Sequence, residues 1–290
     1  MNPEVENKSP YFDKLEKIEF VVTYACTGRC KHCSEGDHKS CGESIKPEAA
    51  ARAVRELTSA YPIRTVMAFG GEPLLYPEAV YAIMRAASEC GVPHRQLITN
   101  GFFSKEQSRI EEVARMLADC GVNDLLLSVD AFHQETIPLA TVTEFARTAR
   151  GFGIPVRLSP AWLVSPEEDN PYNRRTREIL DSFADFDVTI GDGNVIFPEG
   201  NAIKYLAEYF EKMHPRTHIP RTRVKLNASR SSPTAAFSTK ISTTKAYSKS
   251  CKSTPRVKFT PEFSPKRKGK SRPCIILTEK LPLSPAAHAE

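Results

Sequence analysis

The sequence predicts an α/β fold, and three observations point to it. Six short apolar runs alternate with segments whose apolar residues recur at helical spacing. Helix-closing glycines recur about 30 residues apart, which is the length of one strand-plus-helix unit in a parallel sheet. Polar motifs follow the expected strands, where parallel βα folds place their sites. Six units are too few to close an eight-stranded barrel, so we expect an open, TIM-like partial (βα)6 barrel.

The apolar runs predict where the strands lie, and the glycines predict where the helices end. The expected strands are residues 18–23, 65–69, 96–99, 124–129, 156–163 and 188–197. The run at 125–127 is apolar throughout, as in a strand that is covered on both faces. Apolar stripes begin at Val80, Ile110 and Val142, and the helices that carry them should close at glycines that adopt a left-handed conformation. These glycines are Gly91, Gly121 and Gly153.

Charge divides the chain into unlike parts. The net charge is +5, but the last 80 residues hold 18 Lys and Arg against 4 Asp and Glu. This stretch is rich in Ser, Thr and Pro, and such a composition buries too little apolar area to offset the ordering entropy. We therefore expect an N-terminal arm at 1–14, a core domain at 15–210, and a disordered, low-complexity basic tail at 211–290. The abrupt change suggests a tail that is foreign to the fold, as a frame change would produce.

Composition also excludes several classes of protein. The chain has 290 residues, of which 40% are hydrophobic and 26% charged, so disorder along its full length is excluded. It has no apolar run long enough to span a membrane, and its polar start lacks the pattern of a secretion signal. We therefore expect a cytoplasmic protein that has no membrane partner.

Three of the eight cysteines are closely spaced after the first expected strand, in the run Cys26-Thr-Gly-Arg-Cys30-Lys-His-Cys33. A short loop with this spacing can bring three thiolates around one soft centre, for which zinc and an iron–sulfur cluster are the realistic occupants. His38 and Cys41 could complete a zinc site, so zinc stays open. The remaining cysteines are interpreted differently: Cys90 and Cys120 as small buried hydrophobes, and those of the tail as incidental.

Further polar motifs follow the second, third and fourth expected strands. Gly70-Gly71-Glu72-Pro73 reads as a turn whose missing side chains expose backbone carbonyls, and Pro73 can begin a helix. Thr99-Asn100-Gly101 ends the third strand. Ser128 and Asp130 share one face at the end of the fourth.

The Cys-x3-Cys-x2-Cys spacing resembles the signature of the radical S-adenosylmethionine (radical SAM) superfamily. The resemblance covers about residues 15–205 and implies that Cys26, Cys30 and Cys33 hold a four-iron, four-sulfur (4Fe-4S) cluster whose fourth iron binds S-adenosylmethionine. His32 then occupies the position next to the adenine. The GGEP stretch, with Gly70, Gly71, Glu72 and Pro73, looks like the family's motif for the methionyl ammonium group. The resemblance extends to Asn100, Ser128 and Asp130 for the ribose or methionyl carboxylate, and Arg157 could also pair with that carboxylate.

The family chemistry that this resemblance implies is the reductive cleavage of S-adenosylmethionine to a 5′-deoxyadenosyl radical, which takes a hydrogen atom from a substrate. It also implies an anaerobic reaction and an electron donor such as flavodoxin or ferredoxin. The substrate is not identified, and we expect a peptide or a small metabolite. The alternative is a metal-stabilised module, with zinc or a plain iron–sulfur centre, that binds or transfers electrons and whose basic tail contacts nucleic acid. The tail has few aromatic residues for base stacking, so we do not expect nucleic-acid binding.

Overall fold

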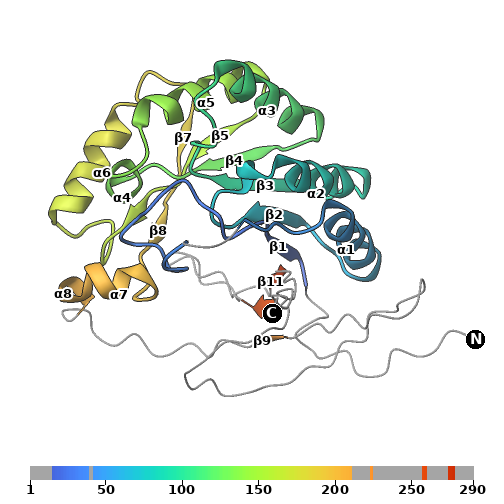
Figure 1. Ribbon diagram of the computed structural model, residues 1–290, viewed down its shortest axis with the longest axis horizontal. Helices are drawn as coiled ribbons and strands as arrows, with labels where there is room; N and C mark the ends of the chain where they lie inside the picture. The colour runs from blue at the N-terminus through green and yellow to red at the C-terminus, as the bar shows by residue number, and fades with distance from the viewer. Residues whose placement is uncertain (1–14, 39–41, 211–222, 225–256, 260–273, 278–290) are drawn as a thin grey trace, which may run out of the picture.

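The computed structural model describes residues 15–38 and 42–210, together with three short strands beyond them. Six strands form a parallel, curved sheet with helices on its outer side, and the sheet does not close into a barrel (Figure 1). This is the partial barrel that the sequence predicts. The order of these six strands in the sheet is β7-β5-β4-β3-β2-β1, so consecutive strands lie side by side except where β6 intervenes in the sequence, and three further strands described below extend the sheet beyond β1.

The strands begin close to the predicted positions. Their bounds are β1 Lys17–Val21, β2 Thr65–Phe69, β3 His94–Thr99, β4 Asp124–Leu127, β5 Val156–Leu158, β6 Ala161–Trp162, β7 Thr189–Ile190 and β8 Asn194–Val195. The fifth and sixth predicted strands are each split in two, and β6 pairs with β8 in a second, two-stranded sheet. The split lies at Pro160 and Gly193. Gly193 has a φ of +71°, and a Cβ atom there would lie 2.1 Å from the Pro160 carbonyl oxygen.

The helices close as predicted. They are α1 Pro47–Ala60, α2 Pro77–Glu89, α3 Gln107–Asp119, α4 Ala131–Gln134, α5 Leu139–Gly151, α6 Pro171–Asp181, α7 Asn201–Tyr205 and α8 Ala207–Phe210, with the 3₁₀ turn η1 at Pro73–Leu75. Gly91, Gly121 and Gly153 follow α2, α3 and α5 with φ of +71°, +85° and +80°. These values lie in the left-handed region, which glycine adopts without steric cost.

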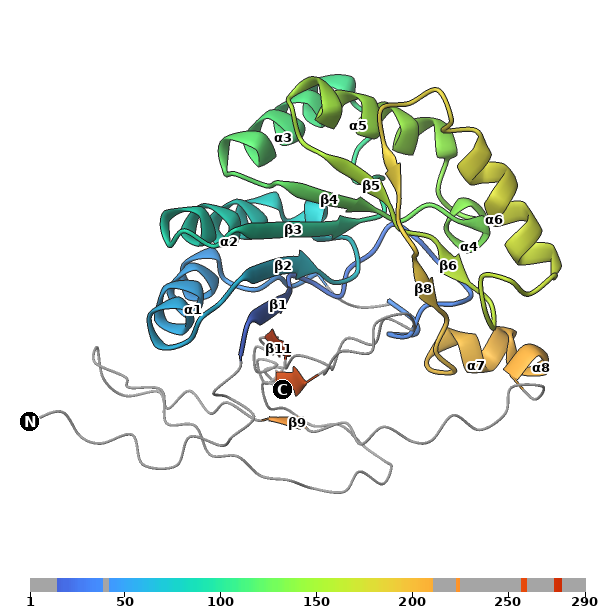
Figure 2. The same cartoon turned by 180° about the vertical axis from the view of Figure 1, so that it is seen from behind.

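The core lies between the sheet and the helices on its outer side. Fully buried side chains of the strands, such as Phe20, Leu97 and Leu125, belong to the same cluster as Met84 of α2 and Phe145 of α5. Seen from behind, β5 continues toward β6 and β7 toward β8, and α7 and α8 follow at the end of this pair (Figure 2). Cys120 is buried in the core as expected, whereas Cys90 is exposed, so its interpretation as a buried hydrophobe is wrong.

Part of the stretch beyond residue 210 is described as strands. β11 (Cys274–Leu277) pairs in parallel with β1, and β10 (Val257–Phe259) lies antiparallel between β11 and β9 (Arg223–Val224). The predicted arm at 1–14 and most of the predicted tail lie outside the described residues, so this division stays a prediction. Among the described helices, none is long and apolar enough to cross a membrane.

Candidate cluster and cofactor site

The three closely spaced cysteines lie in the loop that leaves the carboxyl end of β1. Gly28 lies between two of them: a Cβ atom there would be 3.2 Å from the Sγ of Cys30 and 3.7 Å from the Sγ of Cys26. A side chain at this position would therefore fill the space between the two sulfurs. Glycine lets the backbone pass close to both sulfurs and to Ile137, and a short loop that brings thiolates together suits a compact metal centre.

Burial makes the thiols of this loop poor acids in the protein without a metal. It raises the pKa of Cys26 to about 11, and it also raises the pKa of Cys30 and Cys33. Each of these three pKa values is shifted chiefly because a buried thiolate loses its hydration. Iron or zinc ions would supply the positive charge that stabilises the thiolates, so the donor set fits a metal centre.

Hydrogen-bond partners surround two of the sulfurs. The backbone N–H of Gly28 donates to the Sγ of Cys26 at 3.3 Å, and the Nδ2 of Asn100 approaches the same sulfur at 3.6 Å. The Nε2 of His38 lies 3.3 Å from the Sγ of Cys33, and its Nδ1 lies 2.6 Å from the carbonyl oxygen of Tyr24. His38, which the sequence suggests as a zinc ligand, therefore lies beside the cysteine loop. Cys41 lies outside the described residues.

The start of α7, which is far from the cysteine loop in the sequence, holds this loop through hydrogen bonds. The backbone N–H of Asn201 donates to the carbonyl oxygen of Cys33 at 2.9 Å, and its Nδ2 donates to that of Cys30 at 3.3 Å. Gly200 precedes it with a φ of +57°, and a Cβ atom there would lie 2.5 Å from the Cys33 carbonyl oxygen. The last unit of the barrel thus packs directly on the loop that carries the cysteines.

The GGEP stretch lies against the backbone that leads into the same loop. Gly71 donates its N–H to the Thr23 carbonyl at 2.8 Å, and Glu72 donates to the Ala25 carbonyl at 2.7 Å. A Cβ atom on Gly71 would lie 2.2 Å from the Ala25 carbonyl oxygen, so only glycine fits this approach. Among the described residues, none donates a hydrogen bond to the carbonyl oxygens of Gly70 or Gly71.

Glu72 joins this stretch to the end of β3. Its buried carboxylate accepts from the Leu74 N–H at 2.9 Å, from the Thr99 hydroxyl at 2.7 Å and from the Asn100 N–H at 2.8 Å. Burial raises the pKa of Glu72 to about 7 in spite of these bonds. Pro73 begins the turn η1, as the sequence predicts.

Asp130, at the end of β4, is fully enclosed and hydrogen-bonded on both oxygens. Oδ1 accepts from the N–H groups of Phe132 and His133 at 2.9 Å, and Oδ2 accepts from the Nδ1 of His133 at 2.7 Å and from the Ala161 N–H at 3.0 Å. Although burial acts to raise it, pairing with His133 holds the pKa of Asp130 at about 2. The carboxylate, His133 and His32 are close enough to hold a metal ion. However, all the lone pairs of Asp130 are engaged, so this group does not make a free metal site.

His32 and Ser128 lie at the same end of the barrel, and Arg157 does not. The His32 ring packs 5.0 Å from that of Phe132 and 4.7 Å from that of His133, and burial lowers its pKa to about 4. Ser128 follows β4 directly and is half-buried. Arg157 instead pairs with Asp124, the first residue of β4, at the opposite end of that strand. This geometry does not favour the expected contact of Arg157 with the methionyl carboxylate.

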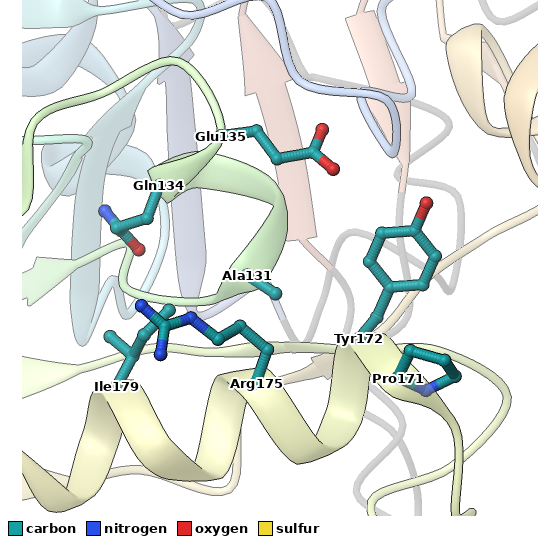
Figure 3. Close-up of a pocket in the computed structure, with 7 residues that line it drawn as sticks. All are labelled: Ala131, Gln134, Glu135, Pro171, Tyr172, Arg175 and Ile179. Carbon is teal, nitrogen blue, oxygen red and sulfur yellow. The ribbon is translucent and has the colours of Figure 1, made fainter.

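A cavity of about 300 Å³ lies between α4 and α6. Figure 3 shows Glu135, at the end of α4, and Tyr172, from α6, on the same side of this cavity. The ammonium group of Lys31, from the cysteine loop, pairs with Glu135 at 2.9 Å and lies 5.8 Å from the centre of the Tyr172 ring. The cavity wall is thereby tied to the loop that carries the cysteines.

The structure also brings in residues that the sequence does not single out. Thr136 accepts a hydrogen bond from the Arg29 N–H at 3.1 Å, and Ile137 lies beside Gly28. These contacts join segments more than 100 residues apart in the chain. No spacing or motif signals such a contact, because it depends on how the end of β4 meets the end of β1.

Comparison with known proteins agrees with this geometry. The family model described as the radical SAM superfamily matches residues 20–168, about half of the chain. The probable GTP 3′,8-cyclase of Sulfolobus acidocaldarius is 29% identical over 161 residues, which are 52% of this chain and 49% of that protein. The GTP 3′,8-cyclase of Bradyrhizobium diazoefficiens is 26% identical over 176 residues, 55% of this chain and 48% of that protein. The chain thus spans about half the length of these curated relatives.

A solved structure shares the fold. The crystal structure of Streptococcus suis SuiB bound to the precursor peptide SuiA matches with a TM-score of 0.50 and 13% identity. The match covers 69% of this chain and 47% of that one, and it supports the partial-barrel architecture alone. The family match spans the cysteine loop, the GGEP stretch and the ends of β3 and β4. The chain therefore belongs to the radical SAM superfamily, whose members use a 4Fe-4S cluster and S-adenosylmethionine.

Proposed function

We propose that Cys26, Cys30 and Cys33 hold a 4Fe-4S cluster and that S-adenosylmethionine binds at its fourth iron. When bound, this pair supplies an electron that cleaves the cofactor's carbon–sulfur bond and a 5′-deoxyadenosyl radical that abstracts hydrogen from a substrate. The observation that carries the proposal is the set of three cysteines on one short loop, where Gly28 lets the backbone lie close to the sulfurs of the half-buried Cys26 and the buried Cys30.

The residues around the cysteine loop would bind and shield the cofactor. The carbonyl oxygens of Gly70 and Gly71 are acceptors for an ammonium group, and Glu72 holds that turn against β3 through its hydrogen bonds. The amide of Asn100 reaches both Cys26 and Thr27, so it would orient the first part of the loop. Burial of these groups would keep water away from a reactive species.

Reconstitution under anaerobic conditions tests the cluster. We expect about four irons and four sulfides per chain, the content of a 4Fe-4S cluster. Cys30→Ala should lose most of this iron, because it removes one of the three ligands. Cys90→Ala is the matched control, since Cys90 is exposed at the end of α2. Zinc without sulfide in the wild-type chain would instead favour the zinc alternative.

A second experiment tests the chemistry. Incubation of the reconstituted chain with dithionite and S-adenosylmethionine should release 5′-deoxyadenosine, and Cys30→Ala should abolish the release. An intact cluster that leaves S-adenosylmethionine uncleaved would favour a plain electron-transfer module.

The substrate we expect is a peptide or a small metabolite. GTP is the first probe because it is named for the curated relatives. GTP as substrate would increase 5′-deoxyadenosine formation above the rate without it.

The proposal extends to the cellular setting. A reduced flavodoxin or ferredoxin would supply the electron, and the reaction would take place in the cytoplasm. Deletion of residues 211–290 separates this function from the alternative of nucleic-acid binding. Unchanged S-adenosylmethionine cleavage after the deletion would support the enzyme, and loss of tight RNA or DNA binding would support the alternative.

A further inference from the structure

Asn100 follows β3 directly, and its side chain lies beside the cysteine loop. The residue is buried, with 5% of its surface exposed. Its Nδ2 lies 3.6 Å from the Sγ of Cys26 and 3.1 Å from the Oγ1 of Thr27. Sulfur is a larger atom than oxygen, so a hydrogen bond to sulfur is longer than one to oxygen. A buried amide from another strand thus meets the first cysteine of the loop.

Hydrogen bonds on either side fix the orientation of this amide. Its Oδ1 accepts from the Phe102 N–H at 2.8 Å, and this bond identifies which end of the amide is the oxygen. The backbone N–H of Asn100 donates to the Oε2 of Glu72 at 2.8 Å. Gly101, with a φ of +73°, donates its N–H to the Thr99 hydroxyl at 3.0 Å. The amide therefore presents its Nδ2 to the cysteine loop and cannot turn over without losing a bond.

The donors of this amide are all used inside the protein. A side-chain amide has two hydrogens to donate and one oxygen that accepts. In Asn100 the two hydrogens have the Cys26 sulfur and the Thr27 hydroxyl oxygen as partners, and the oxygen accepts from Phe102. No hydrogen of the amide is left for the ribose or the methionyl carboxylate, the contacts that the family resemblance implies for Asn100.

The Cys26 sulfur accepts hydrogen bonds from two different kinds of donor. The backbone N–H of Gly28 donates to it at 3.3 Å, and this donor belongs to the loop itself. The second donor is the Asn100 amide, which depends on a single side chain from another strand. A substitution can therefore remove the second bond and leave the first in place.

We propose that Asn100 is a positioning residue for the cluster: its amide donates a hydrogen bond to the Cys26 sulfur and helps to set how easily the cluster accepts an electron. This inference rests on the proposed function, because it takes Cys26 as a cluster ligand. A hydrogen bond to a ligand sulfur stabilises the additional negative charge of the reduced cluster, so it raises the reduction potential.

The test is a redox titration of the reconstituted full chain, followed by electron paramagnetic resonance of the reduced cluster. Asn100→Leu keeps nearly the same shape and removes the amide. Thr27→Val removes the other partner of this amide and leaves the contact with Cys26. Asn123→Leu is the matched control, because the Asn123 amide also accepts from one backbone N–H and donates to one carbonyl, both at 2.8 Å, near the start of β4.

We expect Asn100→Leu to lower the ratio of reduced to oxidised cluster about tenfold at a fixed potential, which corresponds to about 59 mV for a one-electron couple. Thr27→Val and Asn123→Leu should titrate like the wild type. An Asn100→Leu cluster with the wild-type potential would overturn the proposal. An equal shift in Thr27→Val would also overturn it, because the shape of the loop and not the bond to sulfur would then set the potential.

A second measurement needs no change at Asn100 and decides the matter even if Asn100→Leu loads no cluster. Pulsed electron paramagnetic resonance of the chain labelled with ¹⁵N in its asparagine side chains should show coupling between the reduced cluster and a labelled nitrogen. The coupling should persist in Asn201→Ala, since the Asn201 amide bonds to the Cys30 carbonyl and not to a sulfur. Absence of the coupling, or its loss in Asn201→Ala, would overturn the proposal. A wild-type chain without an iron–sulfur signal would instead refute the proposed function.

Discussion

Gly71→Ala should destabilise the fold at the point where the GGEP stretch meets the cysteine loop. The added Cβ atom would lie 2.2 Å from the Ala25 carbonyl oxygen, 2.7 Å from the Ala25 carbonyl carbon and 3.0 Å from the Tyr24 carbonyl carbon. All three are backbone atoms, so no side-chain rotation relieves the contact. The backbone must move by about 1 Å to reach an ordinary contact distance, and overpacking of this kind costs about 1–3 kcal/mol.

The shift would also disturb two hydrogen bonds. Gly71 and Glu72 donate to the Thr23 and Ala25 carbonyls at 2.8 and 2.7 Å, and each such bond contributes about 0.5–1.5 kcal/mol. We therefore expect the free energy of unfolding to fall by about 2–5 kcal/mol, a large part of the stability of a typical domain. The expected side effect is weaker loading of the cluster, because Ala25 precedes Cys26.

Urea denaturation of the cluster-free chain, followed by circular dichroism, measures this loss. Gly91→Ala is the control, because Gly91 has a φ of +71° and nothing lies within 4 Å of its Cβ position. It should cost only the left-handed strain, about 1–2 kcal/mol. If Gly71→Ala unfolds at the same urea concentration as Gly91→Ala or above it, the close approach of the two segments is not as described.

Three further changes test the hydrogen bonds around the site. In the wild type, the free energy of unfolding should fall by about 3 kcal/mol between pH 5 and 8, because burial raises the pKa of Glu72 to about 7 and its ionisation in the folded chain is unfavourable. Glu72→Gln should abolish this fall, and the urea midpoints at the two pH values measure the difference. Asp130→Asn should cost about 2–4 kcal/mol at neutral pH, since an amide has one acceptor atom and cannot accept from both Phe132, which donates to Oδ1, and Ala161, which donates to Oδ2. The difference in free energy of unfolding between this variant and the wild type should shrink in urea titrations as the pH falls from about 4 toward 2, where Asp130 of the wild type becomes protonated. Asn201→Ala should cost about 1 kcal/mol and speed hydrogen exchange at Cys33, because it removes the bond to the Cys30 carbonyl.

The elements with a strong local signal were predictable from the sequence. β2 occupies the predicted residues 65–69, and the three helix-closing glycines have the expected left-handed conformation. Apolar runs and glycines determine local structure through residues that are close in the sequence, so their effect can be predicted from neighbouring residues. The predicted strand at 156–163 failed at Pro160, which has no N–H to donate and whose carbonyl meets the positive-φ residue Gly193. That contact joins two predicted strands, and the sequence of either strand alone does not predict it.

The position of the site was predictable for the same reason, since motifs at the ends of parallel strands must meet at one edge of the sheet. The cysteine loop, Gly70, Gly71 and Asn100 do meet there. Side-chain roles are harder to predict, because a motif gives the place of a residue and not the groups that use its lone pairs. The roles assigned to Ser128 and Arg157 therefore stay predictions.

The motifs at Glu72 and Asp130 do not reveal the hydrogen bonds that these carboxylates accept from the protein. Both fit a family pattern for cofactor binding, yet each carboxylate accepts three or more hydrogen bonds from the protein itself. A buried carboxylate needs such partners, because an unpaired one costs several kcal/mol. At Asp130, where each oxygen already accepts two hydrogen bonds, direct contact with the cofactor would have to replace one of them and leave a buried donor unpaired, whereas the Oε2 of Glu72 accepts only one. The geometry therefore favours a division of roles, in which backbone carbonyls and cysteine sulfurs face the cofactor and the two carboxylates hold the loops that carry them.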